Sequence, residues 1–170
     1  NLNMIMHKKK MSSRNIRKKK SCLNEKKKKK KQSNSYSYRS DGYKLIENSD
    51  TSYGNSYDSG DIIGVALDLD NNKLYFSKNG TWQNSGDPTS GSTGTGAIPI
   101  SLTSNTGFWF IAANSNSASG TSVWEHNYGN GYFGTTAITS AGSNGNGSLF
   151  EYDVPSGYYA LNTKNINTYG

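Results

Sequence analysis

The sequence is poor in the features that stabilise a small protein covalently or anchor it in a membrane. Its single cysteine, Cys22, has no partner for a disulfide within the chain, so stability has to come from packing. No apolar run approaches the roughly 18 residues that suggest a membrane span. Residues 1–6 are too few and too polar for the apolar stretch of a secretory signal, so we expect no secretion by a recognisable signal.

Histidine is also scarce, which restricts the catalytic chemistry open to the chain. Only His7 and His126 are present, and His7 lies close to the N-terminal end. A histidine-based triad would have to use His126, and no cysteine nucleophile or nucleophile elbow follows the lysine-rich N-terminal stretch. We therefore expect a non-catalytic protein without a cofactor or a metal.

What the chain does contain favours β-structure. Hydrophobic residues make up only 32% of it, and 19 glycines are interspersed with many serines, asparagines and threonines. This composition is typical of short strands joined by polar turns rather than of long helices. At 170 residues the chain is long enough for one ordinary domain with a core.

The net charge of +7 is distributed very unevenly. Residues 1–31 hold 14 of the 19 basic residues and a single acidic residue, Glu25, whereas residues 32–170 hold the other 5 basic and 11 acidic residues. The first segment therefore carries +13 and the rest of the chain −6. The positive net charge is therefore no reason to expect an anionic partner for residues 32–170.

The lysine-rich segment, residues 1–34, is expected to be disordered because it cannot bury enough apolar surface to offset the entropy of ordering it. Three interpretations stay open: a solvated tail, an arm that binds nucleic acid or another anionic surface, and an out-of-frame stretch, because its commonest residues have adenine-rich codons. The domain is then expected to span residues 35–166.

Several short segments after residue 34 have strand patterns. Residues 62–69 and 73–78 are rich in branched and aromatic residues and predict a central hairpin. Asn79-Gly80 is a strong turn signal, because both residues accept positive φ. Further strands are expected near Tyr36 to Tyr43 and at residues 97–102, where Pro99 indicates an edge or a bulge. Strands are also expected at residues 107–113, 149–154 and 158–161. The pattern predicts an all-β, antiparallel sandwich or barrel.

The stretch YDSGDIIGVALD (residues 57–68), followed by KLYFSKNGTW (residues 73–82), resembles the SPRY domain in order and spacing. Residues 97–100 resemble the proline-containing strand of that family, and residues 155–163 resemble the tail of SPRY-like proteins from phages and aquatic viruses. The resemblance covers roughly residues 35–165. The aromatic-rich N-terminal strands typical of the family have no counterpart in residues 1–34, so the domain is expected to be N-terminally incomplete.

The resemblance implies a concanavalin-like jelly roll that binds a protein, a peptide or a surface glycan through loops at one end of the sandwich. It also implies that the domain belongs to a virion-associated phage or viral structural protein. The loops expected to bind are residues 53–57, 84–94, 114–121 and 128–133, because Tyr, Asn, Ser and Gly make adaptable contact surfaces. The tryptophans fit a core role better than a ligand platform. The candidate contact residues are Tyr53, Tyr57, Trp82, Asn84, Asp87, Asn116, Trp124, Tyr128 and Tyr132.

Two other function classes stay open at this point. A glycan-active enzyme could use two carboxylates from Glu125, Glu151 and Asp153, and a nucleic-acid-binding protein could use residues 1–31. The spacing Asp68-x-Asp70-x-Asn72 matches the start of a calcium loop, but Lys73 stands where such a loop needs glycine. Turn formation explains those side chains better than a calcium site.

Overall fold

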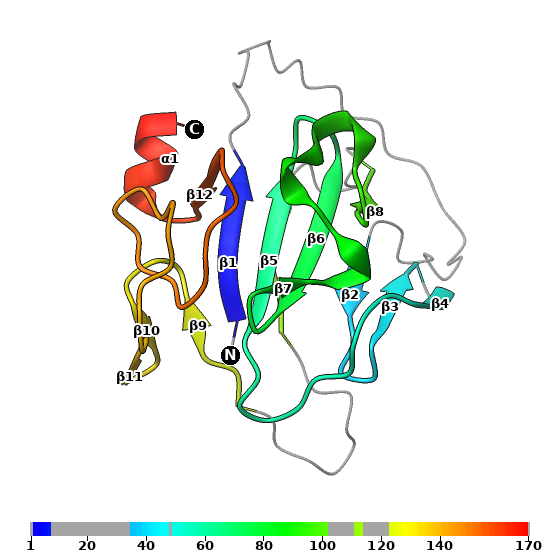
Figure 1. Cartoon of the computed structure of the whole chain (residues 1–170), viewed down its shortest axis with the longest axis horizontal. Helices are drawn as coiled ribbons and strands as arrows, with labels where there is room; N and C mark the ends of the chain where they lie inside the picture. Colours follow the sequence, from blue (N-terminus) through cyan, green and yellow to red (C-terminus); the bar gives the residue numbers. More distant parts are fainter. Residues whose placement is uncertain (1, 8–34, 48, 102–110, 114–122, 170) are drawn as a thin grey trace, which may run out of the picture.

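The computed structural model describes residues 2–7, 35–47, 49–101, 111–113 and 123–169. Within them, strands dominate, in sheets that are mostly antiparallel, which confirms the predicted all-β sandwich (Figure 1). The elements are β1 (Leu2–His7), β2 (Tyr36–Tyr38), β3 (Tyr43–Ile46), β4 (Ser49–Ser52), β5 (Ile63–Asp68), β6 (Lys73–Lys78), β7 (Thr81–Trp82), η1 (Gln83–Ser85), η2 (Pro88–Thr93), β8 (Ile98–Pro99), β9 (His126–Asn127), β10 (Tyr132–Phe133), β11 (Thr136–Ala137), β12 (Tyr158–Ala160) and α1 (Thr163–Tyr169).

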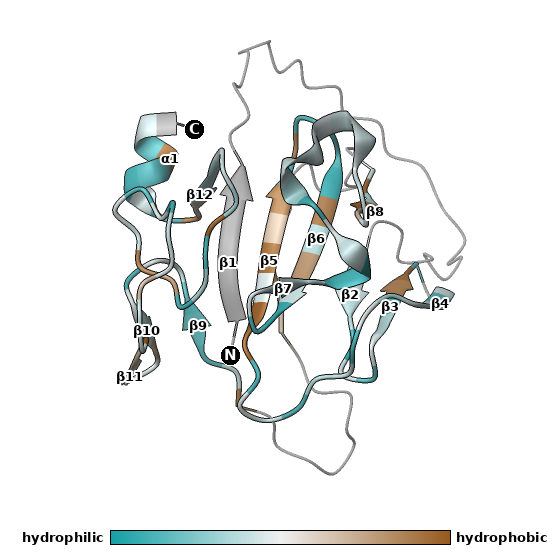
Figure 2. Cartoon of the chain, in the orientation of Figure 1, coloured by the Kyte–Doolittle hydropathy of each residue, from teal (hydrophilic) through white to brown (hydrophobic). Residues whose placement is uncertain are grey.

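The predicted hairpin, β5 and β6, lies at the centre of the larger sheet. The two strands pair antiparallel over their whole length, with Val65 opposite Phe76 and Ala66 opposite Tyr75. Figure 2 shows much of both strands in the brown of hydrophobic residues. The turn between them is closed by Asp68, whose Oδ1 accepts hydrogen bonds from the backbone N–H groups of Asp70 (3.0 Å) and Asn71 (2.9 Å). This confirms that Asp68 forms a turn.

The two faces of the hairpin bury different partners, because successive strand residues point to opposite sides. Val65 and Phe76 face the three-stranded sheet of β2, β3 and β4, and Tyr38 of β2 belongs to the same cluster. Ala66 and Tyr75 point the other way. The second cluster is completed from the C-terminal part of the chain by Phe150, Val154, Tyr158 and Ala160.

Strand β1 departs from the sequence expectation. It lies between β5 and β12 in the larger sheet, and among the pairings of the described strands only those of β1 with β5 and β9 are parallel. The sequence places Leu2–His7 in the lysine-rich segment before residue 35, but Leu2 to Met6 carry none of the charge of the lysine runs that follow, and they form a strand. Residues 8–34 lie outside the described part of the chain, so their disorder stays a prediction.

The later segments agree with the sequence in part. Tyr158–Ala160 is a strand as expected, and β8 is reduced to Ile98–Pro99 beside β6. Residues 149–154 are not a strand: only Leu149 pairs, in an isolated bridge. The backbone of Phe150 and of Val154 is bonded instead to the loop at residues 142–143. Of the predicted strand at 107–113, the structure describes residues 111–113, which are irregular.

Helix α1 was not expected from the sequence. Its signal is Asn162, whose Oδ1 accepts a hydrogen bond from the backbone N–H of Asn165 (3.0 Å), an N-cap interaction. The helix spans seven residues. No helix in the described ranges has the length and apolar character to cross a membrane.

The Asp61 carboxylate, which precedes β5, gives a prediction about acid titration. It accepts hydrogen bonds from the backbone N–H of Asp58 (2.8 Å) and from Asn79 Nδ2 (2.7 Å), and it pairs with Lys78 Nζ (3.0 Å). These contacts, the Asp58 N–H first, lower the pKa of Asp61 to about 2. Because the folded pKa is depressed, the stabilisation is complete above the ordinary aspartate pKa of about 3.9 and is lost as the pH falls toward the folded value.

A carboxyl-detected NMR titration measures this pKa directly. We expect a value of about 2 in the wild type and a value closer to that of a free aspartate in Lys78→Met, because the ammonium partner is gone. Asp50→Asn, which alters an exposed pair with Arg39, is the control and leaves the Asp61 pKa unchanged. An ordinary aspartate pKa in the wild type would contradict the bonding described for Asp61.

Candidate functional site

The most prominent irregular element over the larger sheet is the 83–96 loop, which contains η1 and η2 and follows β7. It crosses the face of β5 and β6 that is turned to the viewer in Figure 1. Gly, Ser, Thr, Asn and Asp make up most of it. Such residues form turns readily and offer hydrogen-bonding groups to a partner.

Two buried tyrosines of the core contact the loop from the side of the sheet. Tyr75 of β6 is fully buried, and its hydroxyl lies 3.5 Å from Ser90 Oγ. Tyr158 of β12 is also buried and donates a hydrogen bond from its hydroxyl to the carbonyl oxygen of Pro88 (2.9 Å). Burial raises the pKa of the Tyr158 hydroxyl, so it remains a donor throughout the neutral range. Half-buried Trp82 packs edge-on against Tyr75, with ring centroids 6.4 Å apart.

Hydrogen bonds within the loop fix its shape. Asp87 Oδ1 accepts bonds from the backbone N–H (2.8 Å) and the hydroxyl (2.6 Å) of Thr89, and these bonds lower the pKa of Asp87. Ser90 Oγ donates to the Asp87 carbonyl oxygen (2.6 Å) and accepts from the Thr95 backbone N–H (2.9 Å). The backbone N–H of Asp87 closes the ring on the Thr95 carbonyl oxygen (3.0 Å). The loop is therefore ordered before any partner arrives.

The two limbs of the loop also touch each other. A Cβ added at Gly96, where φ is +66°, would lie 2.5 Å from the Cα of Gly86, so this approach requires glycine. Asn84 adopts a left-handed backbone (φ +57°) and donates from Nδ2 to the Gly96 carbonyl oxygen (3.3 Å). The side chains exposed on the outside of the loop are those of Asn84, Ser85, Asp87, Thr89, Ser92, Thr93 and Thr95.

The neighbouring loop at residues 53–57 contributes two tyrosines to the packing beside β6. Tyr53 is buried, and its hydroxyl accepts a hydrogen bond from the backbone N–H of Phe76 at the edge of β6 (3.2 Å). Burial raises the pKa of Tyr53 to about 12. Tyr57 donates from its hydroxyl to the Tyr38 carbonyl oxygen (3.0 Å), and Trp124 packs edge-on against its ring at 6.2 Å. Tyr53, Tyr57 and Trp124 thus belong to an aromatic cluster.

Gln83 connects the two loops, and sequence reasoning missed it. Its side chain is buried, with Oε1 accepting from the Asn55 backbone N–H (2.7 Å) and Nε2 donating to the Thr81 carbonyl oxygen (2.8 Å). A Cβ at Gly54 would lie 2.5 Å from the same Oε1. A glutamine after a short strand is ordinarily exposed, so only its three-dimensional neighbours reveal this role.

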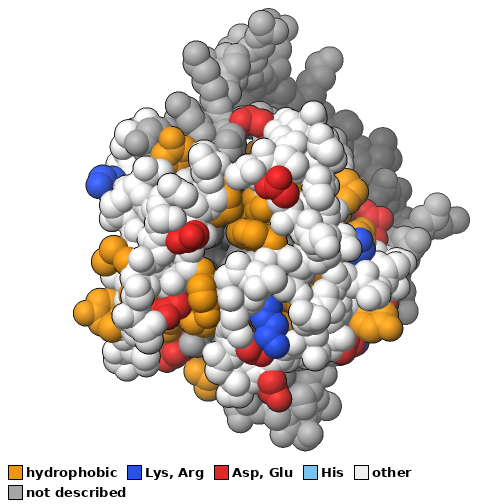
Figure 3. Space-filling model, in the orientation of Figure 1, with side chains coloured by type: hydrophobic (Ala, Val, Ile, Leu, Met, Phe, Trp, Pro, Cys, Tyr) orange, Lys and Arg blue, Asp and Glu red, His pale blue; other side chains and the backbone are white. Residues whose placement is uncertain are grey.

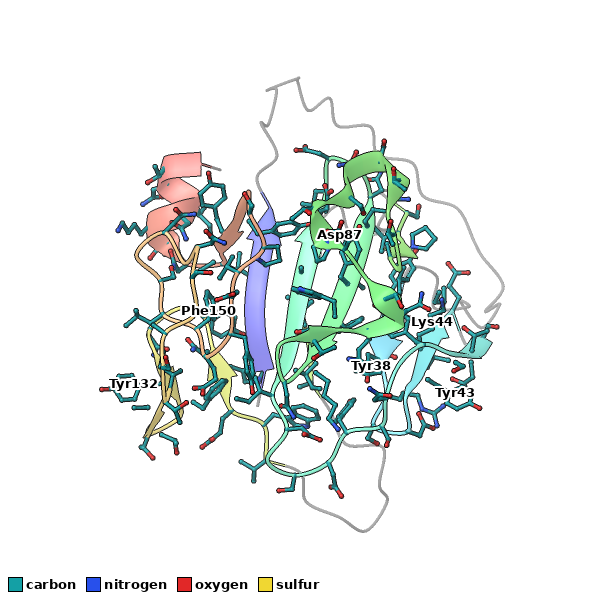
Figure 4. All side chains as sticks on the ribbon, in the orientation of Figure 1. Tyr38, Tyr43, Lys44, Asp87, Tyr132 and Phe150 are labelled. Atoms are coloured by element: carbon teal, nitrogen blue, oxygen red, sulfur yellow. The ribbon has the colours of Figure 1, made fainter. Side chains whose placement is uncertain are left out.

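The candidate residues do not form one surface. Trp82, Asn84 and Asp87 belong to β7 and the 83–96 loop, whereas Tyr128 and Tyr132 are exposed near β9–β11. Figure 4 shows Asp87 and Tyr132 well apart. Asn116 lies outside the described residues. The structure therefore separates side chains that the sequence assigned to one end of the sandwich.

Two of the three carboxylates considered for glycan chemistry are bonded to nearby turns. Glu151 accepts hydrogen bonds from the backbone N–H (2.7 Å) and the hydroxyl of Thr139, and Asp153 accepts from the Ser143 backbone N–H (2.6 Å). These bonds keep the pKa of Asp153 below its ordinary value. Within the described ranges, no group of three or more His, Cys, Asp or Glu side chains is placed to hold a metal ion.

Two packed sheets that carry a polar, internally hydrogen-bonded loop define a β-sandwich scaffold. The family model of the SPRY domain matches residues 15–112, more than half of the chain, and the chain belongs to the SPRY domain family. The match includes β2 to β8 and the 83–96 loop, and β9 to α1 lie beyond it. Comparisons with curated proteins and with solved structures gave no significant match.

Proposed function

We propose that this chain is a non-catalytic recognition module that binds a protein or peptide on the outer surface of the 83–96 loop. SPRY domains are generally protein-interaction modules, which supplies the class of function. The observation that carries the assignment to this loop is its internal order: the side chains of Asp87, Ser90 and Asn84 form hydrogen bonds with the loop backbone. A partner then binds without the entropic cost of ordering the loop.

The chemistry of the loop surface favours a peptide or protein over an anionic polymer. Its exposed side chains are hydroxyls, one amide and one carboxylate, and residues 32–170 together carry −6. Such a surface makes directional hydrogen bonds with peptide groups, and it repels phosphate. The similarity of residues 155–163 to SPRY-like proteins of phages and aquatic viruses extends the proposal to a module within a viral or phage structural protein.

A peptide-display selection on the full chain tests the proposal. The affinity of the enriched peptides is then measured for the wild type and for Thr93→Arg, which places a bulky charge on the exposed part of the loop. Thr51→Arg on β4 is the matched control at another exposed threonine. We expect at least about tenfold weaker binding to Thr93→Arg, because losing a central contact commonly costs about 1.4 kcal/mol or more.

Both variants should unfold at the wild-type temperature, since neither side chain is buried. Enriched peptides that bind Thr93→Arg as tightly as the wild type would place the recognition surface elsewhere. Peptides weakened equally by Thr51→Arg would show a general effect of charge and would likewise contradict the assignment to the 83–96 loop.

A further inference from the structure

A second exposed surface lies on the C-terminal part of the chain, beyond the residues that match the family model. Tyr128, Tyr132 and Leu149 are 40%, 48% and 47% exposed, and we call these three residues the β9–β11 surface. Figure 3 shows hydrophobic side chains exposed along this side of the molecule, with acidic side chains close by. Large apolar side chains at this exposure commonly mark an interaction site when they occur together.

A buried amide holds this surface in shape. Asn127 is fully buried, and its Oδ1 accepts hydrogen bonds from the backbone N–H groups of Gly129 (2.7 Å) and Gly131 (3.4 Å). Its Nδ2 donates to the Leu149 carbonyl oxygen (2.9 Å), and the Leu149 N–H donates to the Gly129 carbonyl oxygen (2.9 Å). The turn that carries Tyr128 is therefore fixed to the segment that carries Leu149.

The ring of Tyr128 and the backbone of Tyr132 are each positioned by their neighbours. Tyr128 stacks on His126, with ring centroids 5.9 Å apart and planes inclined by 8°. Tyr132 begins the β10–β11 hairpin opposite Ala137, and its backbone N–H donates to Asn130 Oδ1 (3.3 Å). Rigid tyrosines lose little side-chain entropy on binding and provide a large contact area.

Two carboxylates flank the same hairpin. Glu125 lies at its turn, since a Cβ added at Gly134 would be 2.6 Å from Glu125 Oε1. Glu151 is fixed at its far end by the backbone N–H of Thr139 (2.7 Å). From residue 113 to the C-terminus the sequence contains three acidic residues, and Lys164 is its only lysine or arginine. The electrostatic field here favours a cationic partner over an anionic one.

We propose that the β9–β11 surface binds a lysine- or arginine-bearing peptide segment of a partner protein. A guanidinium or ammonium group interacts favourably with a tyrosine ring face, and it forms charge-assisted hydrogen bonds with a carboxylate. Tyr128 and Tyr132 provide the rings, Glu125 and Glu151 provide the carboxylates, and Leu149 takes the aliphatic part of the ligand side chain. This surface is independent of the 83–96 loop.

Fluorescence anisotropy on the full chain tests this proposal with labelled glycine–serine peptides of one length that carry either arginines or glutamates. We expect binding of the arginine peptide only. Tyr132→Ala should weaken it about tenfold, as removal of a partly desolvated cation–π contact does, and Tyr132→Phe should keep it. Tyr43→Ala, at a 44% exposed tyrosine on β3, is the matched control and should leave the affinity unchanged.

The double variant Glu125→Gln with Glu151→Gln tests the carboxylates. It should also lower the affinity for the arginine peptide about tenfold, while the size of both side chains is retained. Equal binding of the glutamate peptide, no binding of the arginine peptide, or equal effects of Tyr132→Ala and Tyr43→Ala would overturn the proposal. A wild-type dimer in light scattering that dissociates with Tyr132→Ala would overturn it too, because a second copy would then occupy the surface.

Discussion

Replacing Tyr75 by alanine is expected to lower the free energy of unfolding by about 3–5 kcal/mol, the range found when a buried aromatic side chain is truncated in a core. Tyr75 is the largest fully buried side chain of the described part of the chain. Its ring lies between Trp82 and the C-terminal residues of the second core cluster, and its hydroxyl lies under Ser90. Chemical denaturation followed by tryptophan fluorescence and circular dichroism measures the loss.

The same variant should also abolish the proposed recognition by the 83–96 loop, because the ring that packs beneath the loop is removed. Tyr75→Phe is the matched control: it keeps the ring and removes only the long 3.5 Å contact with Ser90, so it should cost less than about 1 kcal/mol. If Tyr75→Ala unfolds within about 1 kcal/mol of the wild type, the packing described between β6 and the C-terminal segment is wrong.

Replacing Asn127 by alanine is expected to cost about 2–4 kcal/mol, because several buried backbone groups lose their hydrogen-bond partner at once. Gly129 and Gly131 lose the acceptor Oδ1, and the Leu149 carbonyl oxygen loses the donor Nδ2. The amide fills a fully buried position. Thermal and denaturant unfolding measure the effect.

Hydrogen exchange should localise this effect. In Asn127→Ala the amide protons of Gly129 and Gly131 should exchange faster, while those of β5 and β6 change only with the global stability. Asn130→Ala is the control, since Asn130 is exposed and accepts one bond, from Tyr132. Equal destabilisation by Asn127→Ala and Asn130→Ala would contradict the anchoring role given to Asn127.

The central hairpin could be predicted from the sequence because local and global preferences agree there. Residues 62–69 and 73–78 are rich in branched or aromatic residues, and Asn79 and Gly80 adopt positive φ values, +47° and +80°, that asparagine and glycine tolerate. The SPRY domain family was likewise identifiable from the residues around this hairpin, and the family model confirms it. The preference of Asp68 for turn formation is equally local.

The positions of individual aromatics could not be predicted, because burial depends on distant partners. Tyr53 and Tyr132 both lie among Gly, Asn and Ser, yet Tyr53 closes the edge of β6 while Tyr132 is 48% exposed. The burial of the polar residues Gln83 and Asn127 could not be predicted either, since each is hydrogen-bonded to a segment far along the chain. Strand β1 was missed because its apolar residues directly precede the lysine runs.

The 83–96 loop divides its residues into two sets, and this division affects how the protein can evolve. The side chains of Asp87, Ser90 and Asn84 form hydrogen bonds with the loop backbone, while Ser92 and Thr93 are exposed between two glycines. Substitutions at the outward positions leave the frame intact, since they remove no buried contact. On our proposal that this loop binds a partner, new specificities can arise by a few point changes on an unaltered scaffold, and the same two positions are natural choices for building a combinatorial library.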